Sequence, residues 1–115
     1  MKKFYENVVL LNDLLLKTGK EFVFCANIPA SEENELDGAD YWRIFHMNDV
    51  HDVFVKASID CGFPLIDLYT EFCRYCLSEG MKIDSLLSDG LHPNDHGYRV
   101  IYSLIMKQLG LSCSV

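Results

Sequence analysis

A carboxylate and an imidazole lie three residues apart near the end of the sequence, at Asp89 and His92, on a glycine-containing turn before an apolar segment. This spacing lets Asp89 accept a hydrogen bond from one ring nitrogen of His92, which fixes the tautomer and stabilises the imidazolium. The other ring nitrogen can then take a proton from a nucleophile. The alternative is an ordinary helix-start turn, in which Asp89 binds backbone amides and His92 faces solvent.

The block over residues 88–98, with the apolar run over 99–109 behind it, resembles the last sequence block of the SGNH (GDSL-like) ester hydrolases. In that family the Asp and the His of this block are two members of a Ser-His-Asp triad. The resemblance therefore implies that Asp89 and His92 are catalytic, and it implies no metal and no organic cofactor. It extends over the first predicted helix and two predicted strands, as expected for the C-terminal half of such an enzyme.

The nucleophile of that family has no counterpart in this sequence. No Gly-Asp-Ser turn and no Gly-x-Asn-Asp block occurs in the 115 residues. Ser31 follows a predicted strand but lacks the tight glycine turn that exposes a nucleophile. Asn27 also ends a strand, yet its surroundings do not match the family's oxyanion asparagine. We therefore expect the serine and the oxyanion donors to come from outside the chain, which would be inactive alone.

Two other pairs of residues suggest metal or thiol chemistry, which would make the chain a small metal or thiol protein. His92 and His96 could bind a metal, but paired helical ligands need both histidines in one helix, and Pro93 intervenes. Cys73 and Cys76 form a CxxC, but redox motifs of this kind open a helix, whereas Cys73 falls inside a predicted one. We expect buried cysteines, a solvent-facing His96 and no metal site.

Two further histidines, His46 and His51, are five residues apart and share no helix face. We expect both to be ordinary surface residues.

The composition limits the partners. Half of the residues are apolar, which at this length allows one domain with a modest core. The net charge of −7 leaves no basic stripe for phosphate contacts and argues against nucleic acid. No apolar run approaches the roughly 20 residues of a membrane span. The five cysteines show no repeated spacing, which suits a reducing compartment. We expect a cytoplasmic protein, although a lost N-terminus could have carried a signal.

The hydrophobic periodicity predicts alternating helices and strands. Helical spacing and continuous apolar runs alternate along the chain, and such runs are typical of parallel strands covered on both faces. The predicted elements are a helix over 2–17, a strand over 21–27, an acidic loop over 31–40, a helix over 41–61, a strand over 63–68, and helices over 69–79 and 95–109. Asn94 is the predicted N-cap of the last helix.

The first and the last helix are expected to turn an apolar face inward. The residues of these faces are Phe4, Val8, Leu11 and Leu15 in the first helix, with Leu10 and Leu14 beside them, and Val100, Ile101, Leu104, Ile105 and Leu109 in the last.

These elements predict a single partial α/β domain over residues 1–115, with about two parallel strands and four helices. The resemblance implies the three-layer α/β/α, flavodoxin-like SGNH hydrolase fold. Two parallel strands alone leave an open apolar edge, so we expect a homodimer or association with a missing N-terminal half. The expected function is cleavage of an acyl or acetyl ester of a small molecule or carbohydrate. The alternative is a non-catalytic truncated module that self-associates through the open sheet edge.

Overall fold

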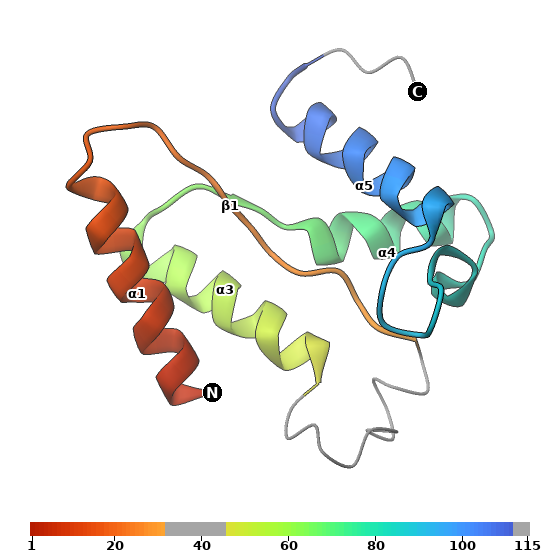
Figure 1. Cartoon of the computed structure of the whole chain (residues 1–115), viewed down its shortest axis with the longest axis horizontal. Helices are drawn as coiled ribbons and strands as arrows, with labels where there is room; N and C mark the ends of the chain where they lie inside the picture. The colour runs from red at the N-terminus through yellow and green to blue at the C-terminus, as the bar shows by residue number, and fades with distance from the viewer. Residues whose placement is uncertain (32–45, 112–115) are drawn as a thin grey trace.

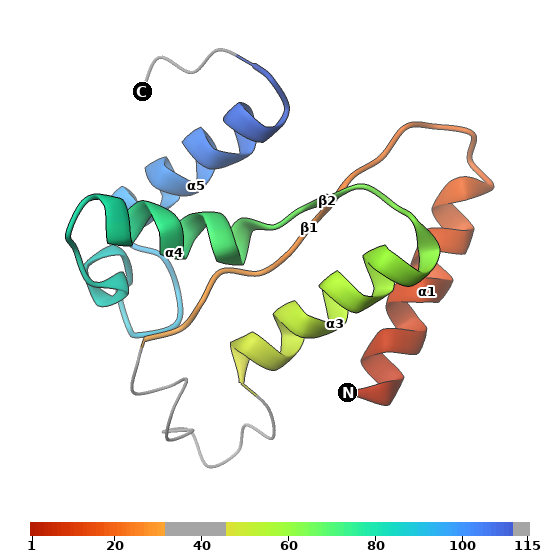
Figure 2. The same cartoon turned by 180° about the vertical axis from the view of Figure 1, so that it is seen from behind.

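The computed structural model describes residues 1–31 and 46–111, in which four α-helices lie around a two-stranded parallel sheet (Figures 1 and 2). The elements are α1 (Lys2–Leu16), β1 (Phe24–Cys25), α3 (Met47–Cys61), β2 (Leu65–Ile66), α4 (Leu68–Ser78), the 3₁₀-helix η1 (Ile83–Leu86) and α5 (Asp95–Gln108). The predicted α/β partial domain with two parallel strands and four helices is therefore confirmed. Within the described ranges, every helix is too short or too polar to span a lipid bilayer.

The strands pair in the predicted direction but over a shorter length. Phe24 lies opposite Leu65 and Cys25 opposite Ile66, in parallel. The amide of Phe24 donates to the carbonyl of Pro64 at 3.1 Å. The predicted strands over 21–27 and 63–68 are too long, because each strand has a hydrogen-bonded neighbour on one side only among the described residues.

The helix ends follow local sequence signals. α3 ends at Gly62, whose φ of 76° is the left-handed conformation that glycine adopts without strain. α5 begins after Asn94, whose Oδ1 accepts the amide of Gly97 at 2.8 Å, as predicted. The acidic loop beyond Ser31 and the first residues of the predicted 41–61 helix lie outside the described residues.

The core consists of two apolar clusters, one at each end of the strand pair. The first joins α1, β1 and α3 through Val8, Phe24, Ala57 and Phe63. The second joins α4, η1 and α5 through Phe72, Cys76, Leu86 and Val100. The described chain measures 41 × 40 × 19 Å, so along its shortest axis it is about as thick as two layers of roughly 10 Å each.

The packed face of α1 differs from the predicted face. Val8 and Asn12 are buried, whereas Leu11 is 46% exposed, and Leu10 and Leu14 are exposed as well. The prediction for Leu11 is wrong because α1 turns its 8/12 side toward α3, with Phe4, Tyr5 and Leu15 beside it.

A second inward prediction fails in the last helix. Leu109 is exposed, since it lies just after the last residue of α5.

Candidate active site

Asp89 and His92 form the hydrogen bond that their spacing predicts. Oδ2 of Asp89 lies 2.7 Å from Nδ1 of His92. Oδ1 of the same carboxylate accepts the amide of Leu91 at 3.0 Å and the amide of His92 at 2.7 Å. An ionised carboxylate can only accept hydrogen bonds, so this contact assigns the proton to Nδ1 and the lone pair to Nε2. The ring is thus held in the tautomer that a general base requires.

The same three donors keep Asp89 ionised. The amide of His92, then its ring, then the amide of Leu91 lower the pKa of Asp89 from 3.8 to about 2. The side chains of His92 and Asp89 are 68% and 56% exposed, so the pair is open to solvent. At neutral pH the imidazole therefore has the negative charge of Asp89 beside Nδ1, and most of its side chain is open to solvent.

Backbone hydrogen bonds hold the loop that carries the pair. The amide of Ser88 donates to the carbonyl of His92 at 2.8 Å, which closes the loop across its base. The amide of Ser31 donates to the carbonyl of Gly90, also at 2.8 Å. Gly90 has a φ of 80°, a conformation that favours glycine. The loop is therefore fixed both to itself and to the segment that follows β1.

The start of α5 holds the other end of the loop. Asn94 donates its amide to the carbonyl of Leu86 and its Nδ2 to the carbonyl of Ser85, both at 2.9 Å. The first turn of α5 also lies so close to η1 that a β-carbon on Gly97 would collide with the carbonyl of Leu86. The position of the imidazole is therefore set by η1 and α5 together.

Asn27 and Ser31, the two other candidates that follow β1, make hydrogen bonds that hold neighbouring segments together. Nδ2 of Asn27 donates to the carbonyls of Ile28 at 3.1 Å and Met47 at 2.9 Å, which ties the end of β1 to the start of α3. Ser31 is buried against the His92 loop, and its amide donates a hydrogen bond to the carbonyl of Gly90. The structure thus brings Ser31 near the loop and engages Asn27 with α3.

The metal and thiol alternatives receive no support from the geometry of the described residues. No cluster of three or more potential metal ligands occurs within residues 1–31 and 46–111. His96 is exposed in the first turn of α5, as predicted. Cys73 lies in the interior of α4, and Cys76 is buried, which raises the pKa of its thiol. Neither cysteine therefore occupies the helix N-terminus that activates a redox thiol.

A second imidazole–carboxylate pair, which sequence reasoning missed, joins α3 to the start of α4. Nε2 of His51 lies 2.8 Å from Oδ1 of Asp67, and the imidazole stacks on the ring of Tyr69 with centroids 4.6 Å apart. The side chain of His51 is 15% exposed, so the prediction of an ordinary surface residue is wrong. The available signal was Asp67 itself, a carboxylate directly after a strand with Thr70 three residues later, which is an N-cap pattern.

The surroundings of Asp67 explain its charge state. Burial raises the pKa of its carboxyl, but hydrogen bonds from His51 and from the amide and hydroxyl of Thr70 outweigh burial. The net pKa of Asp67 therefore lies below its usual value. Asp67 caps α4 and His51 fastens α3 to that cap, so this pair is structural.

Residues 1–31 and 46–111 thus form a partial α/β domain that carries the exposed imidazole–carboxylate pair of His92 and Asp89. No protein-family model and no curated protein matches the sequence. Among solved structures, the chain is similar to a member of the lipolytic protein G-D-S-L family from Veillonella parvula. The TM-score is 0.63 at 18% identity, over 90% of this chain and 50% of that chain. This likeness shows a GDSL-like fold, and the chain spans about half the length of the solved chain that it matches.

Proposed function

We propose that the chain supplies the imidazole and the carboxylate of an SGNH/GDSL-type ester hydrolase. His92 is the general base and acid, and Asp89 is its positioning residue. The observation that carries this proposal is the 2.7 Å contact between Asp89 Oδ2 and His92 Nδ1, which leaves the lone pair on Nε2 of a side chain that is 68% exposed. The GDSL-like fold supports the same assignment.

In this function, Nε2 of His92 takes the proton of a serine while the serine oxygen attacks the ester carbonyl. Asp89 stabilises the imidazolium, which then gives the proton to the leaving alcohol oxygen. Water then attacks the acyl-enzyme while losing a proton to Nε2. As the bond between the acyl group and the serine oxygen breaks, the imidazolium returns that proton to the serine, and the free acid is released. The substrate is an acyl or acetyl ester of a small molecule or carbohydrate, and the chemistry requires no metal and no organic cofactor.

We further propose that residues 1–115 correspond to the C-terminal half of such a hydrolase and are inactive alone. The 115 residues contain no Gly-Asp-Ser turn, and they match half of the solved chain. The serine and the oxyanion donors then belong to a segment outside this sequence. Ser31 lies against the His92 loop but is buried, which makes it a poor nucleophile.

The test is covalent labelling by a fluorophosphonate, which reacts with activated serines, followed by intact-mass measurement. The chain is labelled alone and mixed with the half of the Veillonella parvula chain that lies outside the match. We expect no adduct alone, and in the mixture one adduct on the added half. His92→Ala should abolish this adduct, whereas His96→Ala, which alters an exposed histidine nearby, should retain it. An adduct that persists in His92→Ala would overturn the proposal.

The second candidate is a non-catalytic module that self-associates through the sheet. The observation that favours it is the single hydrogen-bonded neighbour of β1 among the described residues. Sedimentation of the chain alone tests this candidate, because it requires a stable homodimer that His92→Ala leaves unchanged.

A further inference from the structure

A groove of about 280 Å³ lies between α4 and α5. The residues that line it are Tyr75 of α4 and, from α5, His96, Arg99, Val100, Ser103 and Leu104. Val100 and Leu104 are apolar, whereas the other side chains supply a guanidinium, an imidazole and two hydroxyls. None of these lining residues carries a carboxylate, and neither Asp89 nor His92 is among them. The groove is therefore separate from the acid–base pair.

The polar side chains of α5 line the groove from successive turns of the helix. His96 and Arg99 are three positions apart, and Ser103 follows Arg99 by four, which puts neighbouring β-carbons about 5–6 Å apart on one face. Tyr75 adds a phenol from α4. A single small ligand in the groove can therefore contact both helices at once.

Arg99 has no acidic partner in the part of the chain that the structure describes. Arg74 of α4 pairs with Glu71 at 2.9 Å, whereas no ion pair within residues 1–31 and 46–111 includes Arg99. Arg99 is also exposed, so its five N–H donors are available to a ligand.

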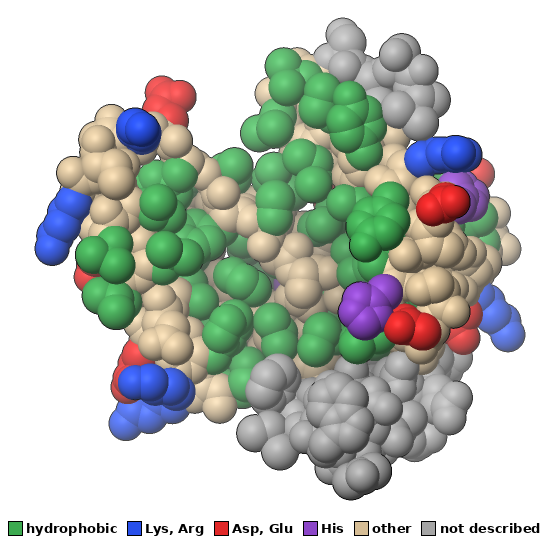
Figure 3. Space-filling model, in the orientation of Figure 1, with side chains coloured by type: hydrophobic (Ala, Val, Ile, Leu, Met, Phe, Trp, Pro, Cys, Tyr) green, Lys and Arg blue, Asp and Glu red, His purple; other side chains and the backbone are tan. Residues whose placement is uncertain are grey.

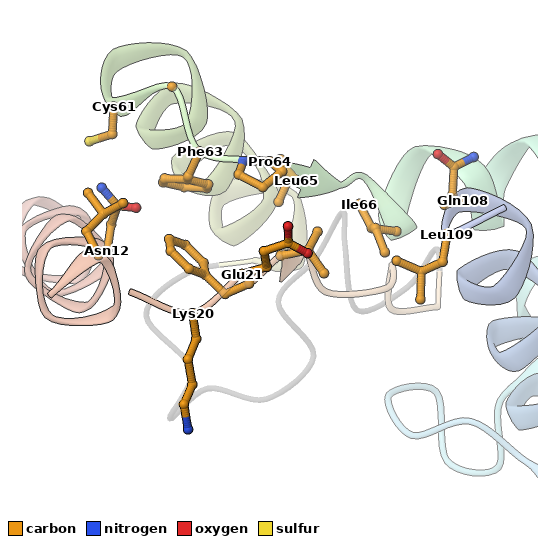
Figure 4. A pocket seen from close by; sticks show the side chains of 14 residues that line it. Asn12, Lys20, Glu21, Cys61, Phe63, Pro64, Leu65, Ile66, Gln108 and Leu109 are labelled. Atoms are coloured by element: carbon orange, nitrogen blue, oxygen red, sulfur yellow. The ribbon is translucent and has the colours of Figure 1, made fainter. Parts of the chain in front are cut away.

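Three other grooves on the described residues differ in charge from the α4–α5 groove. Each holds a lysine together with at least one carboxylate: Lys20 with Glu21, Lys82 with Asp84, and Lys56 with Asp52 and Asp60. Figure 4 shows the first of these, a groove of about 600 Å³ beside the strands, with Lys20 and Glu21 both on it. An anion in any of the three would meet a negative charge, whereas the lining of the α4–α5 groove presents none.

We propose that the α4–α5 groove binds a phosphate monoester. The phosphate lies against Arg99 and His96, and the organic part covers Val100, Leu104 and the ring of Tyr75. The guanidinium offers two parallel N–H donors, and the imidazole and the Tyr75 hydroxyl offer one each. Four donors exceed what the two oxygens of a carboxylate require and suit the three terminal oxygens of a phosphate monoester.

Asp95 limits the affinity of this site. Figure 3 shows basic, acidic and histidine side chains gathered where α5 begins. Asp95 precedes Arg99 by one helical turn, but no ion pair of the described residues joins the two side chains. Its charge still repels a phosphate bound at Arg99, so we expect Asp95→Asn to tighten binding.

The experiment is a titration of the 115-residue chain followed by nitrogen-15 NMR at about 20 mM salt, where screening of exposed charges is weak. The probes are phenyl phosphate, inorganic phosphate and benzoate. Phenyl phosphate should shift the amide signals of residues 96–103 in a saturable way. It should bind about fivefold tighter than inorganic phosphate, because its ring covers apolar surface, and tighter than benzoate.

Matched arginine substitutions locate the contact. Arg99→Ala should weaken the binding of phenyl phosphate by about tenfold or more, as the loss of charge-assisted hydrogen bonds does. Arg99→Lys keeps the charge but not the two parallel donors, so it should recover only part of the affinity. Arg74→Ala removes an arginine outside the groove and should leave binding unchanged. Circular dichroism checks that each variant is folded, and Arg99→Gln replaces Arg99→Ala if the latter is not.

Four outcomes would overturn the inference. The signals of α5 could fail to shift in a saturable way, or Arg99→Ala and Arg74→Ala could weaken binding alike, which would indicate general attraction to positive charge. Benzoate could bind as tightly as phenyl phosphate, which would reject the phosphate monoester. The shifts could also centre on residues 89–92 and disappear in His92→Ala, which would place the anion at the acid–base pair. None of these results depends on fluorophosphonate labelling, so this inference and the proposed function are tested separately.

Discussion

The carbonyl oxygen of Leu86 occupies the space that a β-carbon on Gly97 would need. This close approach places the first turn of α5 against η1 and so sets the end of the His92 loop. Alanine favours a helix interior over glycine by about 1 kcal/mol, yet this contact opposes any added carbon. We expect Gly97→Ala to lower the free energy of unfolding by about 1–3 kcal/mol, as overpacking does.

Urea denaturation measures this change. The control is Lys107→Ala at an exposed position of the last turn of the same helix, which should change stability by less than about 0.5 kcal/mol. If the Gly97→Ala variant is as stable as the wild type, η1 and α5 can move apart to accept the added carbon without a loss in the free energy of unfolding.

The pKa of Asp89 should change according to which of its hydrogen-bond donors is removed. His92→Ala removes the ring but keeps the backbone amides of residues 91 and 92, and the amide of residue 92 is the largest cause of the shift. We therefore expect the pKa of Asp89 to rise from about 2 only part of the way toward 3.8. Carbon-13 NMR of the carboxyl group measures the titration. His96→Ala should leave it unchanged, and a full return to 3.8 in His92→Ala would contradict the backbone contacts.

The cap of α4 should make the chain sensitive to acid. The pKa of Asp67 is lower in the folded chain than its unfolded value of 3.8, so its stabilising contribution is present above pH 3.8. This contribution is lost as the pH falls through the lower folded value. His51→Phe removes one hydrogen bond and keeps a ring against Tyr69, so we expect it to reduce the loss of stability in acid.

Thermal unfolding between pH 2 and pH 6 measures this dependence. Asp52→Asn is the matched control, because its carboxylate lies 3.7 Å from the other nitrogen of His51 and is 76% exposed. An acid dependence that His51→Phe leaves intact would assign the loss to other carboxylates, such as Asp89.

Asn12 offers a substitution expected to stabilise the chain. Its side chain is buried on α1, and its Oδ1 has no hydrogen-bond partner among the described residues. A buried acceptor without a partner costs about 1–3 kcal/mol. We expect Asn12→Leu to raise the free energy of unfolding by about 1 kcal/mol, measured by urea denaturation. Asp13→Leu, at the exposed neighbouring position, should give no such gain.

The sequence predicted those features that a short stretch of chain determines. The order of the helices, the cap at Asn94 and the hydrogen bond that the His92 ring donates to Asp89 all depend on residues within a few positions of one another. The strand lengths could not be predicted, since a ladder extends only as far as its neighbours do.

The remaining differences arise from how helices dock. His51 and Asp67 are 16 positions apart and meet only because α3 lies against the start of α4. Leu11 is exposed and Asn12 is buried because the side of α1 that faces α3 depends on the path of the chain after the helix. Periodicity identified the apolar residues of α1 correctly but gave no information about which of them α3 would cover.

The hydrogen bonds that join Asp89 to Leu91 and to the backbone and ring of His92 all lie within residues 89–92. Forming these hydrogen bonds closes only a short loop and so costs little entropy, whereas the bond from Ser31 to Gly90 must wait until distant parts of the chain meet. The acid–base pair should therefore form early in folding, before the two strands meet. The carboxylate and the imidazole come from four consecutive residues, so the arrangement of this pair does not depend on which segment lies opposite the Nε2 side of the ring.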